Sequence, residues 1–341
     1  MTRLQSIVLA VFCLLIYVQA GASEHHIPGA CENYLNELDS TKNSDLIEVS
    51  DFGSNPGNLK MYKFVPEPEP ENAPLIVALH GTSESPQQYS ENIGWNRLAQ
   101  KHGFIVLYPA QTKTNNATLA FRWFSPEDTR RDMGESGSVK QMIDNIRKNH
   151  SVDDRRIFVT GFSAGASFAT VLCCNYPELF AAGAIMAGTP FRSASSLQEG
   201  FIAMFKGISK PAEEWAKLVH DQQPGYTGRY PALIIFHGDE DRTVKQSNMH
   251  EIVKQFTEIH ATDQEADHTG IIKRHRYSAF HDAYGRTVVE TWQIKGMGHK
   301  YAVDPGNESD QGGKTGTFAS SAGLYSAYYS LISWKLIEQM R

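Results

Sequence analysis

The chain has 341 residues, of which 41% are hydrophobic and 11% aromatic. This is enough apolar material for one large core, and without low-complexity tracts or fixed-period repeats the sequence argues against solenoid and fibrous folds. The formal net charge is −6. A mildly acidic surface offers no electrostatic basis for binding nucleic acid, so we expect no nucleic-acid partner.

The N-terminus has the three parts of a secretory signal peptide. Arg3 supplies a positive charge, residues 7–18 are apolar, and Ala20-Gly21-Ala22 has the small residues of a cleavage site. We therefore expect residues 1–22 to be removed and residues 23–341 to be secreted, outside the cell or in a periplasm. The alternative is an uncleaved membrane anchor, but the apolar run is shorter than the ~20 residues that span a bilayer.

Of the four cysteines, Cys13 would leave with the signal peptide, and Cys31, Cys173 and Cys174 would remain. In an oxidising compartment a disulfide from Cys31 to Cys173 or Cys174 is reasonable. Adjacent residues of a helix point about 100° apart, so only one of the pair can face Cys31. The alternative is that all three are free, buried thiols. Their spacing does not match a zinc site, and we expect no metal.

The first elements in the chain are two short β-patterned runs, at residues 47–49 and 59–64, separated by the turn sequence Gly-Ser-Asn-Pro-Gly at 53–57. We interpret them as a β-hairpin. Continuous apolar runs then predict strands that are buried on both faces, at residues 75–79, 104–108, 157–160, 184–186, 233–236 and 288–294. Helical patterns lie between and after them, at residues 87–102, 139–148, 166–175, 246–260 and 320–339.

This alternation of strand and helix predicts a mostly parallel sheet with helices on both faces. Catalytic groups in such sheets gather at the carboxyl ends of the strands. Residues 189–230 interrupt the alternation and hold several aromatic residues but no clear strand. We interpret this segment as an insertion covering a site, since more than 40 residues is long for a mere connector.

A G-x-S-x-G sequence at residues 161–165 follows the predicted strand 157–160 and precedes a helix. This strand–turn–helix context is that of the nucleophile elbow in α/β-hydrolases. Ser163 would stand at a helix N-terminus, where free N–H groups favour a developing negative charge. The alternative is an ordinary N-cap serine.

Acyl transfer by a serine also needs two N–H donors aimed at the developing oxyanion. Ala164, directly after the nucleophile, is the expected first donor. The second should follow an earlier strand, and His80-Gly81-Thr82 comes after the strand at 75–79. We choose the Thr82 N–H, the alternative being that these residues form an ordinary strand-end turn.

The order of groups in this fold is serine, acid, histidine. Of the thirteen histidines, His299 alone combines three features: it follows Ser163 in the chain, it follows the predicted strand 288–294, and it lies in a glycine turn. The acid should follow the strand at 233–236, where Asp239, Glu240 and Asp241 occur. We choose Asp241, which lies further into the turn, although spacing alone leaves Asp239 open.

Several stretches of the chain resemble the poly(3-hydroxybutyrate) depolymerase-like esterases, which are close to the feruloyl and acetylxylan esterases of carbohydrate-esterase family one. The matching stretches are residues 79–81, 94–99, 104–109, 123–124, 161–166, 176–183, 237–241 with Val244, and 296–299. The resemblance implies the α/β-hydrolase fold and favours Asp241 over Asp239, because the family pattern is H-G-x-x-D-x-x-V. It also implies an ester substrate. Acyl transfer by the proposed serine, histidine and aspartate needs no cofactor, and we expect none.

The expected substrate is a hydroxyalkanoate polyester or its oligomers, and the alternative is a feruloyl or acetyl ester on plant polysaccharide. Trp95, Trp123 and Trp215 are candidates for a substrate pocket, but they are equally explained as core residues. The chain departs from the family by having Thr82 where members often carry cysteine. It also ends in a helix soon after His299, where depolymerases of solid polymer often add a binding domain, so soluble oligomers fit better.

Two further hypotheses remain. The chain could be a peptidase, since the same triad of Ser163, Asp241 and His299 cleaves amides, or a non-catalytic binding protein on a hydrolase scaffold. The binding protein would be expected to have lost a member of the triad, and all three are present in the sequence.

Overall fold

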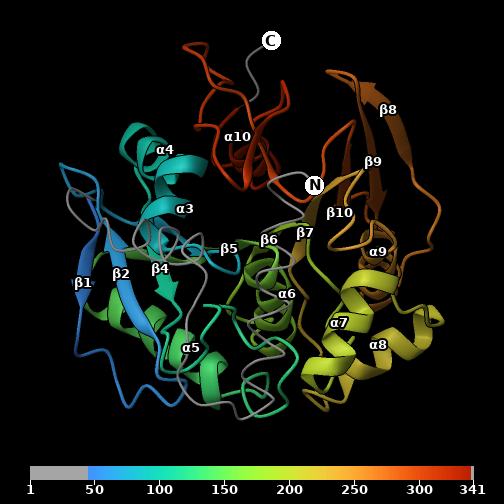
Figure 1. Ribbon diagram of the computed structural model, residues 1–341, viewed down its shortest axis with the longest axis horizontal. Coiled ribbons are helices and arrows are strands. Elements are labelled where there is room, and N and C mark those ends of the chain that lie inside the picture. The colour runs from blue at the N-terminus through green and yellow to red at the C-terminus, as the bar shows by residue number, and fades with distance from the viewer. Residues whose placement is uncertain (1–44, 339–341) are drawn as a thin grey trace, which may run out of the picture. The chain divides into compact units, whose positions relative to one another are not determined.

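The computed structural model describes residues 45–338, shown in Figure 1. The predicted signal peptide and Cys31 lie outside the described residues. The strands are β1 (Ile47–Val49), β2 (Lys60–Phe64), β3 (Ala73–Leu79), β4 (Ile105–Ala110), β5 (Val152–Phe162), β6 (Ala182–Met186), β7 (Ala232–Gly238), β8 (His268–Ile272), β9 (His275–His281), β10 (Thr287–Ile294), β11 (Tyr301–Val303) and β12 (Ala319–Ser321). The helices are α3 (Pro86–Ile93), α4 (Trp95–His102), α5 (Gly134–Asn149), α6 (Ala164–Asn175), α7 (Leu197–Lys206), α8 (Ala212–His220), α9 (Ser247–Ile259) and α10 (Ser326–Ser333).

Ten of the strands form one sheet in the order β1-β2-β4-β3-β5-β6-β7-β10-β9-β8. The six central strands, from β4 to β10, are parallel. Antiparallel strands extend both edges. The predicted α/β-hydrolase architecture is thus confirmed. The chain runs outward from β3 to β4 and then returns to β5 on the other side of β3, and ligands of such sheets bind at a reversal of this kind.

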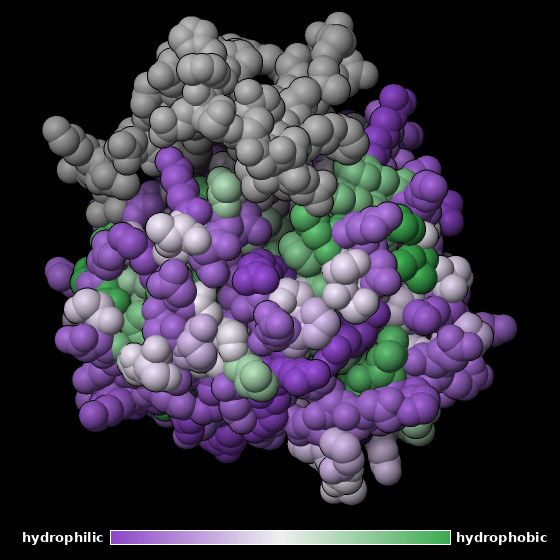
Figure 2. All heavy atoms as spheres, turned by 60° about the horizontal axis from the view of Figure 1, so that its bottom comes forward, coloured by the Kyte–Doolittle hydropathy of each residue, from purple (hydrophilic) through white to green (hydrophobic). Residues whose placement is uncertain are grey.

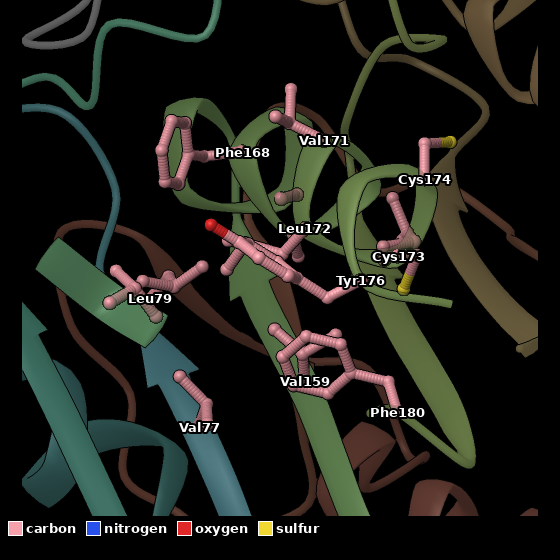
Figure 3. Close-up of a cluster of buried hydrophobic side chains, with 14 of the residues drawn as sticks. Val77, Leu79, Val159, Phe168, Val171, Leu172, Cys173, Cys174, Tyr176 and Phe180 are labelled. Atoms are coloured by element: carbon pink, nitrogen blue, oxygen red, sulfur yellow. The ribbon is translucent and has the colours of Figure 1, made fainter. Parts of the chain in front are cut away.

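The core has two layers because alternate residues of each central strand face opposite sides of the sheet. Leu75, Val77 and Leu79 of β3 face the layer that includes α5, α6 and α9, whereas Ile76 and Ala78 face the layer that includes α3, α4 and α10. In Figure 1, α3, α4 and α10 lie above the sheet, and α5 and α6 lie below it. Figure 3 shows Val77, Leu79 and Val159 close to side chains of α6. Burial on both faces explains the unbroken apolar runs of these strands.

The helical pattern at residues 87–102 forms two helices where the sequence predicts one. Gly94 ends α3 and precedes α4 with a φ of 80°. A Cβ at this position would lie 2.6 Å from the Tyr325 hydroxyl oxygen. Glycine is therefore needed both for the left-handed conformation and for the close approach of Tyr325.

The prediction that the strand at 288–294 is the last one is wrong. The two-stranded parallel sheet β11–β12 follows it, and the closing helix α10 is shorter than predicted. Strands β8 and β9, which pair antiparallel at the edge of the main sheet, were not predicted. All five residues of β8 are exposed, so this strand lacks the apolar run that marks a buried one.

The interruption at residues 189–230 contains α7 and α8. Helix α8 packs on α9, where the Trp215 indole N–H donates a 2.7 Å hydrogen bond to the buried Glu251 carboxylate. The segment is therefore docked onto the helical layer rather than being only a connector. Its role in covering the site stays a prediction.

Cys173 and Cys174 of α6 are fully buried, and in the described part of the chain both are free thiols. Figure 3 shows their sulfur atoms pointing in different directions. Burial raises the pKa of both thiols. The pairing with Cys31 stays a prediction.

Figure 2 shows one face of the molecule, on which hydrophilic residues predominate and hydrophobic residues form separate patches. Between residues 45 and 338, no helix has the length and apolar character needed to cross a bilayer. Within the same range, no three His, Cys, Asp or Glu side chains are grouped so that they could hold a metal ion.

Candidate active site

The turn between β5 and α6 places Ser163 in a strained conformation. Its φ is 53° and its ψ −115°, outside the regions that ordinary residues adopt. A Cβ on Gly161 would lie 2.4 Å from the Gly165 backbone, and one on Gly165 would lie 2.4 Å from the Leu79 carbonyl oxygen. Glycines on both sides therefore let the turn close tightly against β3, and the serine stands at its apex.

Three loops bring Ser163, His299 and Asp241 together. The His299 Nε2 lies 2.8 Å from the Ser163 Oγ, and its Nδ1 lies 2.8 Å from the Asp241 Oδ2. Ser163 follows β5, His299 follows β10 and Asp241 follows β7. Each of these residues is less than 9% exposed. A hydroxyl, an imidazole and a carboxylate in one hydrogen-bonded line form the arrangement that activates a serine nucleophile.

The Asp241 carboxylate is held from both sides. Its Oδ1 accepts hydrogen bonds from the Thr243 and Val244 amides, each 2.9 Å long. Burial by itself would raise the pKa of Asp241, but the nearby His299 and the hydrogen bonds from His237 and His299 hold that pKa below its ordinary value. The group is therefore a stable anion beside the imidazole.

His237 also belongs to this site, although it was not predicted as a site residue. It is fully buried, and its Nε2 donates to the Val244 carbonyl at 2.8 Å and lies 3.5 Å from the Asp241 Oδ2. The residue closes the turn that presents Asp241. Its position at the head of the H-G-x-x-D pattern is the signal that would have indicated it.

Asp239 has a different environment from Asp241. It is exposed, and its Oδ1 accepts a 2.7 Å hydrogen bond from the Gly296 amide. This contact joins the turn after β7 to the turn after β10. The structure thus brings Asp241, and not Asp239, to the histidine.

The loop after β3 is ordered by the His80 ring. The Gln111 amide donates to the His80 Nε2 at 3.2 Å, so Nδ1 carries the proton and donates to the Gly81 carbonyl at 2.8 Å. Burial lowers the pKa of His80 to about 4, which keeps the ring neutral. This neutral form satisfies both hydrogen bonds at once.

The same loop leaves one amide available. The Gly81 N–H donates to the Glu84 carboxylate at 2.9 Å, whereas the Thr82 N–H has no acceptor among residues 45–338. Ala164 is the first residue of α6, so its N–H has no partner within the helix. Thr82 and Ala164 therefore remain the candidate oxyanion donors.

The three tryptophans do not share one environment. Trp95 is 0% exposed and stacks on Trp334 with ring centroids 6.0 Å apart, and Trp215 is also 0% exposed. A ring with no exposed surface has none to offer a substrate, so the structure corrects the expectation for both, and they are core residues. Trp123 is 5% exposed and packs edge-to-face on Phe124. It remains a candidate for contacting substrate.

The chain is similar to known proteins in sequence and in structure. Residues 61–313 match the family model described as Esterase PHB depolymerase. The chain is 43% identical over 284 residues to poly(3-hydroxyalkanoate) depolymerase C of Paucimonas lemoignei, covering 83% of this chain and 68% of that protein. It is 34% identical to acetylxylan esterase A of Aspergillus oryzae, covering 65% of this chain and 73% of that protein.

Among solved structures, the acetyl xylan esterase from Aspergillus awamori superimposes with a TM-score of 0.69 at 26% identity, covering 75% of this chain and 94% of that one. The family model spans most of the chain and includes Ser163, Asp241 and His299. The chain therefore belongs to the Esterase PHB depolymerase family.

Proposed function

We propose that this protein is an exported serine esterase that hydrolyses 3-hydroxyalkanoate oligomers through an acyl-enzyme. The observation that carries the proposal is the His299 ring, which lies 2.8 Å from both the Ser163 hydroxyl and the Asp241 carboxylate. The 43% identity to a poly(3-hydroxyalkanoate) depolymerase supports the substrate class. The signal-like sequence of residues 1–22 supports export.

In the proposed first half-reaction, His299 holds its proton on Nδ1 against Asp241 and accepts the Ser163 proton on Nε2. The serine oxygen attacks the ester carbonyl carbon, and the Thr82 and Ala164 amides stabilise the oxyanion. The tetrahedral intermediate then collapses. His299 donates its proton to the departing alcohol, and the acyl group stays on Ser163.

In the second half-reaction, His299 takes a proton from water, and the resulting hydroxide attacks the acyl-enzyme carbonyl. The same two amides stabilise the second oxyanion. Collapse releases the carboxylic acid, and the proton returns from His299 to the serine oxygen. Each turnover therefore consumes one ester bond and one water molecule.

A second candidate is an acetyl or feruloyl esterase acting on plant polysaccharide. The 26% identity and the TM-score of 0.69 to an acetyl xylan esterase favour it. The identity to the depolymerase is higher and extends over more of this chain. We therefore propose the hydroxyalkanoate oligomer, rather than the polysaccharide ester, as the substrate.

The test is a substrate panel with the purified chain and Ser163→Ala. Soluble 3-hydroxybutyrate oligomers, acetylated xylan and methyl ferulate would be offered at matched ester concentration, and the released acid measured. We expect the highest kcat/KM on the oligomers and no turnover by Ser163→Ala. If acetate or ferulate were released faster than 3-hydroxybutyrate, the polysaccharide ester would be the substrate in place of the hydroxyalkanoate oligomer. Fluorophosphonate labelling that persists in Ser163→Ala would disprove the nucleophile.

A further inference from the structure

We propose that Glu84 is a positioning residue that ties the oxyanion loop after β3 to the histidine loop after β10. The inference rests on the proposed esterase function and adds a residue to its machinery. Glu84 lies just before α3 and outside the three-residue line of Ser163, His299 and Asp241.

The carboxyl group of Glu84 bridges the two loops directly. Its Oε2 accepts the Gly81 N–H at 2.9 Å, and its Oε1 accepts the Tyr301 hydroxyl at 3.1 Å. Gly81 precedes the candidate oxyanion donor Thr82, and Tyr301 comes two residues after His299. One side chain thus connects the backbone that presents the oxyanion donor to the segment that presents the base.

The Phe162 ring fills the space beside this bridge. Its centroid lies 4.9 Å from that of His299 and 5.1 Å from that of Tyr301. A Cβ on Gly81 would lie 2.6 Å from the Phe162 ring and 3.0 Å from the Glu84 Oε2. The two loops are therefore in contact through a packed aromatic ring and a carboxyl group, and a shift of one loop moves the other.

A stabilising ion pair does not account for the carboxyl group at this position. Glu84 is 2% exposed, and no Lys, Arg or His nitrogen of the described chain lies within 4.0 Å of it. The titratable groups that face it are the hydroxyls of Tyr89 and Tyr301. Burial raises the pKa of Glu84 to about 7, which the hydrogen bonds from Gly81 and Tyr301 oppose.

A buried carboxyl without a cationic partner is costly for folding, so its contribution is expected in the alignment of the loops. Removing the side chain would leave the Gly81 amide and the Tyr301 hydroxyl without this acceptor. A glutamine would keep both contacts, because its amide oxygen accepts from Gly81 and its NH₂ group donates to the tyrosine oxygen.

The experiment compares Glu84→Ala, Glu84→Gln, Tyr301→Phe and the double variant Glu84→Ala/Tyr301→Phe. The readouts are kcat, KM and the affinity for a trifluoromethyl ketone, which mimics the oxyanion. We expect Glu84→Ala to lower kcat by about 10- to 100-fold, because small misplacements at a reacting centre have effects of this size. KM should change little, and the ketone affinity should fall in parallel with kcat.

We expect Glu84→Gln to restore most of the activity and the double variant to resemble Glu84→Ala, since both single changes remove the same bridge. Glu91→Ala is the matched control. Glu91 is a glutamate of the adjoining helix α3, but it is exposed and pairs with Lys314, and its loss should leave kcat unchanged.

The inference is overturned if Glu84→Ala or Tyr301→Phe keeps the wild-type kcat and ketone affinity. Tyr301→Phe preserves the ring packing and removes the hydroxyl. It therefore tests whether the Glu84–Tyr301 contact affects kcat even if Glu84→Ala does not fold. These outcomes are separate from failure of the proposed function, in which the wild-type chain would show no ester turnover sensitive to Ser163→Ala.

Discussion

Two aspartates of one turn, Asp239 and Asp241, differ in what their carboxylates contact. Asp241 is 6% exposed and bonded to His299 and two backbone amides, whereas Asp239 is exposed and bonded to Gly296. Spacing in the sequence left both open because both residues follow β7 within the same turn. The choice depends on where the distant histidine loop comes to rest.

We predict that Asp241→Asn lowers kcat by about 10³- to 10⁴-fold, because an amide no longer stabilises the imidazolium or selects its tautomer. The measurement is steady-state hydrolysis of a soluble ester. Asp239→Asn is the control in the same turn and should retain activity within a few-fold. Equal losses in the two variants would remove the distinction between the two carboxylates.

At the scale of the elements, the segment 189–230 is held in place by the packing of α8 on α9. Helix α8 buries Trp215 against α9, and the indole N–H is bonded to the Glu251 carboxylate. The same carboxylate accepts a hydrogen bond from the Lys210 amide and another from Lys254. One buried acid thus holds the segment on α9, and the tryptophan is part of that joint rather than of a substrate pocket.

We predict that Trp215→Ala lowers the free energy of unfolding by about 3–5 kcal/mol, as is usual for a buried aromatic residue, and leaves KM unchanged in the folded fraction. Denaturant unfolding and steady-state kinetics measure the two quantities. Trp215→Phe is the control: it keeps an aromatic ring at this position but loses the indole N–H that donates to Glu251 and part of the buried volume, so it should cost less than Trp215→Ala. A raised KM with unchanged stability would return Trp215 to the substrate-contacting residues.

For the molecule as a whole, buried titratable groups tie stability to pH in opposite directions. The pKa of His80 is lowered to about 4, so its contribution to stability is complete above its unfolded pKa near 6.5 and is lost as pH falls toward 4. The pKa of Glu84 is raised to about 7, so its contribution is complete below about 4.5 and is lost as pH rises through 7. Both groups contact Gly81 in the loop after β3.

We predict that protonation of His80 removes up to about 3 kcal/mol of stability between pH 6.5 and pH 4, against the gain that Glu84 makes over the same interval. The Tm of His80→Gln, which does not titrate, should therefore change less unfavourably than that of the wild-type chain over this interval, even if its Tm at pH 7 is lower. The exposed His268→Gln is the control and should keep the wild-type slope. Identical slopes for all three proteins would contradict the prediction.

Much of the fold was predictable from the sequence because its signals are local. Strands buried on both faces require unbroken apolar runs, and the elbow requires small residues around Ser163, so both could be located without coordinates. The exposed strand β8 and the break at Gly94 were not identified. An edge strand carries little hydrophobic pattern, and the break depends on a contact with Tyr325.

The sequence by itself determined the central parallel strands and the family resemblance, and it predicted the chain order of nucleophile, acid and base. Only the tertiary structure showed the contact of Asp241 with His299, the burial of Trp95 and Trp215 in the core, and the bridge that Glu84 makes between two loops. The physical reason is distance along the chain. Periodicity reports the face on which a side chain lies, whereas these contacts join residues of separate loops whose approach is set by the packing of the whole sheet.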